Sequence, residues 1–129
     1  MRILLDTHCW LWLQFKPEEI SAAAREVLHD AETNLYFSTA SAWEIAIKYR
    51  KGKLPLPEPP GKYIPPLLER QRIEPLEMNL KHVLRAGSLP LHHRDPFDRM
   101  LAAQAQVEGL RLATRDRSFT AYGIDLLPL

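Results

Sequence analysis

Short apolar runs alternate along this chain with longer segments whose apolar residues recur at helical spacing. The runs lie at residues 3–5, 35–37, 73–76, 110–113 and 124–127, and each of the last three contains one charged residue, Glu74, Arg111 or Asp125. A short and almost fully apolar run is typical of a strand that is buried on both faces of a parallel sheet. Because helical segments separate the strands, the pattern predicts an α/β fold, an α/β/α sandwich around a mainly parallel central sheet.

The helix with the strongest sequence signal begins at Asp95. Asp95 is a preferred N-cap residue, Pro96 suits the first helical position, and Asp98 lies in the first turn. This helix is expected to run to about Val107 and to end at Gly109. Further helices are predicted over residues 22–28 after Ser21, 40–49 after Ser38 and Thr39, 64–71, and 80–86.

The middle of the chain combines an apolar helix with a proline-rich stretch. Trp43, Ala46 and Ile47 recur at helical spacing, so they are expected to be buried. Six of the eleven prolines fall between positions 55 and 66. Because proline fixes φ and removes a backbone donor, this stretch is expected to be a loop that leads into the helix over 64–71. Pro65 and Pro66 would then lie in the first turn of that helix.

Composition narrows the class of protein. The 129 residues, 46% of them apolar, suit a single domain spanning residues 1–129 with a real core. The lone Cys9 excludes a disulfide-stapled scaffold, and no apolar run is long enough to span a membrane. An acid as early as Asp6 interrupts any secretory signal, so a cytoplasmic protein is expected. The net charge of +1 argues against nucleic-acid binding by bulk electrostatics and leaves only local patches for that role.

Four acids recur where predicted strands end and helices begin. Asp6 directly follows the strand at 3–5, and Asp116 follows the strand at 110–113 by two residues. Glu44 and Asp98 lie near the starts of their helices. Since ligands of an open parallel sheet bind at the carboxyl ends of its strands, we expect these four carboxylates to meet at one edge, with Asp95 nearby.

Such a cluster would need a cation, and hard divalent ions such as Mg²⁺ prefer oxygen ligands. Bound ions of this kind can activate water and stabilise the leaving oxygen of a phosphodiester, so the cluster suggests metal-dependent phosphoryl chemistry. Each acid also has a structural interpretation. Asp6, Asp95 and Asp98 suit helix starts, Asp116 suits a cap for the turn that follows it, and Glu44 suits a solvated helix position.

Four segments, in chain order, carry a more specific signal. They are Ile3-Leu4-Leu5-Asp6-Thr7-His8, Ser41-Ala42-Trp43-Glu44-Ile45-Ala46-Ile47-Lys48, His93-Arg94-Asp95-Pro96-Phe97-Asp98-Arg99-Met100-Leu101-Ala102-Ala103-Gln104-Ala105 and Ala113-Thr114-Arg115-Asp116. Together they resemble the successive motifs of PIN-domain ribonucleases, and in particular the VapC-type toxins of bacterial and archaeal toxin–antitoxin modules. The resemblance spans nearly the whole chain, from position 3 to about 127, and no acid of the family pattern is missing.

The resemblance implies an endoribonuclease that uses Mg²⁺ or Mn²⁺, cleaves an RNA substrate and is neutralised by a small cognate antitoxin. Carried over by position, Asp6, Glu44, Asp98 and Asp116 form its acidic cluster. Asp6 and Asp98 are then the expected direct metal ligands, and Glu44 and Asp116 complete the site directly or through water. Thr7 and Thr114 are expected to support these acids with their hydroxyl groups, whereas Asp95 is expected to be a cap.

Two arginines flank the proposed acids. Arg99 and Arg115 can either clamp substrate phosphates or form structural ion pairs, and the sequence leaves both interpretations open. Lys48, Arg50 and the lysines after them equally suit an RNA-facing patch or the ordinary partners of a helix C-terminus. His92 and His93 lack zinc-ligand spacing, which argues against a zinc site.

Apolar residues near the N-terminus are denser than a monomer of this size is expected to cover. They are Trp10, Leu11, Leu13, Phe15 and Ile20. A homodimer and a groove for an amphipathic segment of an antitoxin would account for them, and both expectations come mainly from the family resemblance. For the three tryptophans, a core or oligomer contact is favoured over RNA stacking.

Two alternatives belong to other functional classes. Another metal-dependent phosphohydrolase can also place an acid after its first strand, but Asp6-Thr7-His8 lacks the second acid two residues on that haloacid-dehalogenase-type phosphatases carry. A non-catalytic interaction module would use all of these acids as caps and solvated charges. Four acids in four separate motifs exceed what capping alone predicts.

Overall fold

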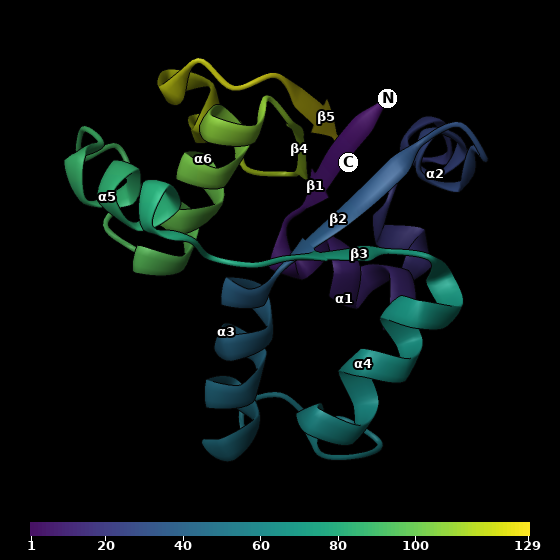
Figure 1. Ribbon diagram of the computed structural model, residues 1–129. Helices are drawn as coiled ribbons and strands as arrows, with labels where there is room; N and C mark the ends of the chain where they lie inside the picture. The colour runs from purple at the N-terminus through teal and green to yellow at the C-terminus, as the bar shows by residue number, and fades with distance from the viewer.

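A five-stranded parallel sheet forms the centre of the protein, which is described by a computed structural model covering residues 1–129 (Figure 1). The strand order is β3-β2-β1-β4-β5, and all four neighbouring pairs are parallel. The strands are β1 Arg2–Leu5, β2 Asn34–Ser38, β3 Glu74–Leu76, β4 Arg111–Thr114 and β5 Leu126–Pro128. This sheet, covered by helices, confirms the predicted fold class.

The central strand β1 explains why its sequence is apolar without alternation. Ile3 and Leu5 point into one core cluster and Leu4 into the other, and all three are fully buried. A strand that is covered on both faces needs an apolar side chain at every position. The registers Leu5↔Phe37 and Leu5↔Ala113 place the carboxyl ends of β1, β2 and β4 at the same edge of the sheet.

Helices cover both faces of the sheet. One face packs against α1 Thr7–Phe15, α2 Ala22–His29, α3 Thr39–Arg50 and α4 Pro60–Gln71. The other packs against α5 Leu80–Ser88, α6 Pro96–Glu108 and the short helix η2 Arg117–Tyr122. A second short helix, η1 Pro17–Glu19, follows α1. Figure 1 shows α5 and α6 side by side, α3 continuing from the end of β2, and α4, which contacts α3, leading into the start of β3. None of the helices is long and apolar enough to cross a membrane.

The proline-rich segment differs from its prediction. Helix α4 begins at Pro60, so Pro65 and Pro66 lie inside the helix rather than in its first turn. Both prolines are exposed, so water can satisfy the carbonyl groups that lose their helical donors. The α6 prediction is confirmed: Asp95 caps the helix and Gly109 ends it in the left-handed conformation.

Trp43 is the main error in the predicted core. Its side chain is 59% exposed, whereas Glu44 and Ile45 of the same helix are buried. The residues of α3 that face the core therefore lie one or two positions away from the predicted ones. Both sets of residues recur at helical spacing, so the spacing alone does not distinguish them. Trp43 instead lies edge-to-face against Phe97 of α6, with ring centroids 5.4 Å apart. Near the N-terminus, Trp10 and Ile20 are fully buried within the monomer, which leaves Phe15, 43% exposed, as the open apolar residue there.

Replacing Trp43 is expected to have little effect on stability. Trp43→Phe should change the free energy of unfolding by less than about 1 kcal/mol, since an exposed side chain contributes little burial. The same change should remove a large part of the acrylamide-quenchable tryptophan fluorescence, because Trp10 is fully buried and Trp12 is partly buried. Urea titrations and quenching curves of both proteins measure this. A loss of several kcal/mol would show that Trp43 is a core residue after all.

Candidate active site

Asp6 occupies the carboxyl end of the central strand. Its backbone N–H donates to the carbonyl of Ala113 at 3.0 Å and so extends the pairing of β1 with β4. Although Asp6 holds the N-cap position of α1, its side chain caps nothing. The carboxylate is 9% exposed and accepts a 2.7 Å hydrogen bond from the Thr114 hydroxyl. This hydrogen bond fixes the orientation of the Asp6 carboxylate.

Glu44 enters the site from α3. The Ser38 hydroxyl caps this helix by accepting from the N–H of Ala40, and Glu44 lies one turn further along, 9% exposed. Its carboxylate pairs with Lys48 at 3.0 Å. Thr7 acts less directly than expected, since its hydroxyl donates to the Ser41 hydroxyl at 2.7 Å and thereby ties α1 to α3.

Asp98 lies in the first turn of α6 and is the most perturbed carboxyl of the site. Burial, followed by the negative charges of Asp95 and Asp6 and a smaller effect of Glu44, raises the pKa of Asp98 to about 7. The pKa of Asp6 is raised too, mainly by burial and slightly by Glu44. Asp6, Glu44 and Asp98 are therefore close enough to repel one another. Asp95 accepts from the backbone N–H groups of Phe97 and Asp98, at 2.7 and 3.3 Å, and so acts as the predicted cap.

Asp116 lies at the border of this group. It is largely exposed, and its carboxylate accepts hydrogen bonds from the Ser118 backbone N–H and hydroxyl and contacts Nε2 of His93 at 2.9 Å. Burial alone would raise its pKa, but the hydrogen bonds from Ser118 and His93 hold the pKa of Asp116 below its usual value. Asp116 also caps η2, as its structural interpretation predicted, and it is not among the charges that raise the pKa of Asp98.

The donor set suits a hard divalent cation. The three mutually repelling groups are all carboxylates, and a bound cation would offset the repulsion that raises the pKa of Asp98. In the structure no three acidic, histidine or cysteine side chains form a ready-made ligand cluster. Mg²⁺ does not require one, because it commonly binds through one or two carboxylates together with water and substrate phosphate.

Both flanking arginines have structural partners. Arg99 donates to the carbonyls of Ala86 and Leu89, each at 2.8 Å, and to those of Pro90 and His93 at 3.1 and 3.2 Å. Arg115 pairs with Glu19 and lies over the Trp12 ring, 4.3 Å from its centroid. The structure therefore favours the structural alternative over the phosphate clamp for both residues.

The sequence reasoning missed His93 and Ser118 as residues of this site, because it tested His93 only as a zinc ligand. His93 is 9% exposed and stacks on Phe119 at a centroid distance of 4.4 Å. The position of His93 directly before the Asp95 cap was the available signal, but its partner Asp116 is 23 residues away in the chain. No local pattern predicts that contact.

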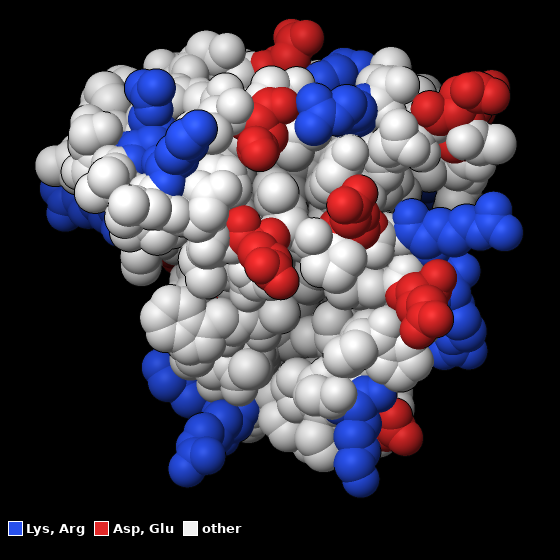
Figure 2. All heavy atoms as spheres, viewed as in Figure 1, with Lys and Arg blue, Asp and Glu red and all other residues white.

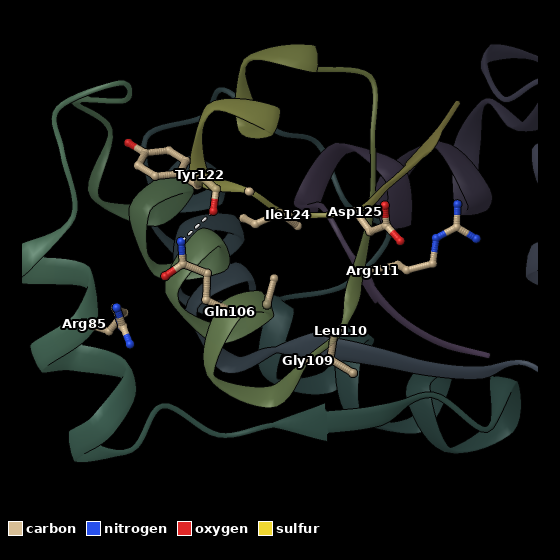
Figure 3. Close-up of a pocket in the computed structure, with 10 residues that line it drawn as sticks. Arg85, Gln106, Gly109, Leu110, Arg111, Tyr122, Ile124 and Asp125 are labelled. Carbon is tan, nitrogen blue, oxygen red and sulfur yellow. Dashed lines mark hydrogen bonds between the residues drawn. The ribbon is translucent and has the colours of Figure 1, made fainter.

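Positive charges are scattered over the surface in Figure 2, and one cavity of the protein lies away from the carboxylate edge of the sheet. On the face shown in Figure 2, Lys and Arg side chains lie mostly around the periphery, and no continuous basic surface covers the middle. A cavity of about 820 Å³ lies at the amino ends of β4 and β5, lined by Leu110, Ile124 and Asp125 among others (Figure 3). There Gln106 donates to the Tyr122 carbonyl at 2.8 Å. In a parallel sheet this is the edge opposite to the one where ligands bind.

The fold and the site define an α/β protein that gathers acids at the carboxyl edge of a parallel sheet. The sequence model of the PIN domain matches residues 3–124. The chain belongs to the PIN domain family.

Two curated proteins of Mycobacterium tuberculosis are similar in sequence. Ribonuclease VapC16 is 45% identical over 68 residues, which are 51% of this chain and 48% of that protein. The chain thus matches about half the length of this relative. Ribonuclease VapC22 is 28% identical over 121 residues, covering 93% of this chain and 91% of that protein.

Solved structures share the fold. VapBC2 from Rickettsia felis, bound to a DNA fragment from its promoter, aligns with a TM-score of 0.74 and 18% identity over 99% of this chain and 98% of that chain. VapBC-1 from nontypeable Haemophilus influenzae aligns with a TM-score of 0.68 and 21% identity over 99% and 98% of the two chains. At these identities the likeness shows the fold alone.

Proposed function

We propose that this protein is a Mg²⁺- or Mn²⁺-dependent endoribonuclease, the toxin component of a type II toxin–antitoxin system, which acts in the cytoplasm. The observation that carries the proposal is the group of Asp6, Glu44 and Asp98 at one sheet edge, where burial, followed by the charges of Asp95 and Asp6, raises the pKa of Asp98 to about 7. Membership of the PIN domain family and relatives named as ribonucleases support it.

The residues have distinct tasks in this proposal. Asp6 and Asp98 would hold the metal, and Glu44 and Asp116 would complete the site directly or through water. When bound, the metal would supply Lewis-acid stabilisation of the phosphodiester and a water of lowered pKa. Thr114 keeps the Asp6 carboxylate oriented through its 2.7 Å hydrogen bond. Lys48, which is paired with Glu44, adds a positive charge beside the site.

Cleavage should depend on a divalent metal. Purified protein freed of its antitoxin and incubated with a single-stranded RNA and Mg²⁺ or Mn²⁺ should produce defined fragments, and EDTA should abolish this. Excess Mg²⁺ should then restore it, because carboxylates bind the ion reversibly. Undiminished cleavage in EDTA would contradict the proposal. Hydrolysis of p-nitrophenyl phosphate without RNA cleavage would instead favour a phosphohydrolase, the second class left open by the sequence.

The antitoxin is proposed to cover apolar surface next to α1. Phe15 is 43% exposed and stacks on Tyr63 of α4 at a centroid distance of 6.0 Å. Leu11 and Leu13 of α1 are only partly buried around the same core. An amphipathic helix recognises its partner through apolar residues of this kind. The family resemblance to VapC-type toxins, together with the two relatives named VapC, supports a protein partner for this chain.

The homodimer is proposed to form through α5. Its Leu80, Val83 and Leu84 are 72%, 48% and 64% exposed, and their spacing places them on one face. Leu84→Glu should therefore convert a dimer into a monomer in sedimentation velocity, with an unchanged far-UV circular dichroism spectrum. Phe15→Glu is the matched control on α1 and should remain dimeric. A dimer that survives Leu84→Glu but dissociates with Phe15→Glu would place the interface on α1.

A further inference from the structure

We propose that His93 is a positioning residue of this site, which fixes the orientation of the Asp116 carboxylate relative to Asp98. The inference rests on the proposed nuclease function and assigns that site a residue that acts through another one. It starts from an unusual combination: a largely exposed carboxylate with a full set of partners, and a buried histidine that supplies one of them.

The carboxylate of Asp116 is held at both oxygens. Oδ2 lies 2.9 Å from His93 Nε2, and Oδ1 accepts from the Ser118 backbone N–H at 2.9 Å and from the Ser118 hydroxyl. An exposed aspartate without such partners would rotate freely. The Ser118 hydroxyl also lies 2.9 Å from His93 Nε2, so the imidazole meets the carboxylate directly and through Ser118. Because Ser118 is itself exposed, His93 connects this group to the interior of the protein.

The imidazole of His93 is rigidly placed. Its ring stacks on Phe119 and Tyr122, at centroid distances of 4.4 and 5.6 Å. The backbone N–H of His93 donates to the Tyr122 hydroxyl at 2.8 Å, and its carbonyl accepts from Arg99 at 3.2 Å. A ring held in this way can transmit its position to the carboxylate that it contacts.

The same contact links both halves of the site. His93 precedes α6, which carries Asp98, whereas Asp116 follows β4. The backbone N–H of Asp116 donates to the Thr114 hydroxyl at 3.1 Å, and this hydroxyl donates to Asp6 at 2.7 Å. A continuous series of hydrogen bonds therefore runs from Asp6 through Thr114 and Asp116 to His93. The His93–Asp116 bond is the step in this series that joins the β4 side of the site to the α6 side.

Two substitutions of His93 distinguish its proposed role in positioning Asp116 from its role in packing. Glutamine places its side-chain amide near the position of Nε2 and can keep the bond to Asp116, whereas asparagine reaches only to about Nδ1. Nδ1 of His93 has no hydrogen-bond partner, so neither substitution removes a bond there. Both remove the ring stacking, and so His93→Gln and His93→Asn form a matched pair.

The test is the rate of metal-dependent RNA cleavage by these variants. We expect His93→Asn to lose about 10- to 100-fold and His93→Gln to stay within about threefold of the wild type, the range typical of residues that orient metal ligands. The double variant His93→Asn/Asp116→Asn should be no slower than Asp116→Asn alone, because both contacts of His93 Nε2, the direct one and the one through Ser118, serve to hold the Asp116 carboxylate. Ser118→Ala, at an exposed position, tests the same carboxylate even if His93→Asn fails to fold, and it should slow cleavage several-fold.

The outcomes are distinguishable. Equal losses in the Asn and Gln variants, or additive losses in the double variant, would overturn the positioning role while the nuclease function stands. If His93→Asn does not fold, a Ser118→Ala protein with wild-type rate would overturn it. If the wild type itself cleaves no RNA with any divalent metal, the proposed function fails, and the inference fails with it.

Discussion

Asp98→Asn is expected to abolish RNA cleavage and, at the same time, to make the metal-free protein more stable at pH 8. The loss of activity should reach roughly a thousandfold, because removing one charged metal ligand costs several kcal/mol of transition-state stabilisation. The gain in stability should be about 1 kcal/mol. The two effects are opposite because the charged carboxylate destabilises the metal-free fold but is needed to bind the cation.

The sign of the stability effect follows from the pKa. Asp98 titrates at about 7 in the folded protein, because of burial and the neighbouring negative charges, and at about 3.9 when unfolded. The folded state therefore binds this proton more tightly, and stability falls as the pH rises from about 4 to 7. Full burial would make the effect roughly 4 kcal/mol. Because Asp98 is only half-buried, solvent screening reduces it, and the lost interaction with the helix dipole reduces it further, to about 1 kcal/mol.

Urea unfolding in EDTA at pH 4 and pH 8 measures this prediction, with cleavage assays on the same proteins. The gain should be present at pH 8 and absent at pH 4. Asp95→Asn is the matched control, since asparagine caps helices as well as aspartate does, so cleavage should persist. An Asp98→Asn protein that is less stable at pH 8 would show that Asp98 serves only as a favourable acid in the first turn of α6.

Arg99→Ala is expected to lower the free energy of unfolding by about 3 kcal/mol. The guanidinium donates to the carbonyls of Ala86, Leu89, Pro90 and His93, and removing it leaves these acceptors without their charged donor. Arg99→Lys should cost somewhat less, about 2 kcal/mol, because one ammonium cannot span all four carbonyls.

Thermal and urea denaturation measure this effect, and Arg94→Ala is the control, since Arg94 is exposed and forms no ion pair. The control should unfold like the wild type. An Arg99→Ala protein that is as stable as the wild type but binds RNA more weakly would contradict this prediction. It would show that Arg99 acts as a phosphate clamp. The sequence had left that role open, and the four carbonyl contacts argue against it.

Much of the fold could be predicted because its signals are local. The apolar run Ile3-Leu4-Leu5 identified a strand that is covered on both faces, and the structure places its side chains alternately in the two core clusters. Asp95, Pro96 and Gly109 marked the ends of α6 correctly, because caps act within one turn of helix. Trp43 was misplaced because two adjacent stripes of α3 are both apolar enough to face a core. Only the packing of α3 against its neighbours decides between them.

The sequence by itself determined the kinds of elements, their order, and the placement of acids directly after strands or at helix starts, since all of these depend on neighbours in the chain. It therefore predicted that Asp6, Glu44, Asp98 and Asp116 approach one edge of the sheet. Only the tertiary structure decided how their surroundings act on them. The contacts of Thr114 with Asp6, of His93 with Asp116 and of Arg99 with Ala86 join residues 108, 23 and 13 positions apart. The raised pKa of Asp98 combines both kinds of cause: Asp95 is three residues away in the chain, whereas burial and the charges of Asp6 and Glu44 come from the tertiary structure, and no local pattern contains them.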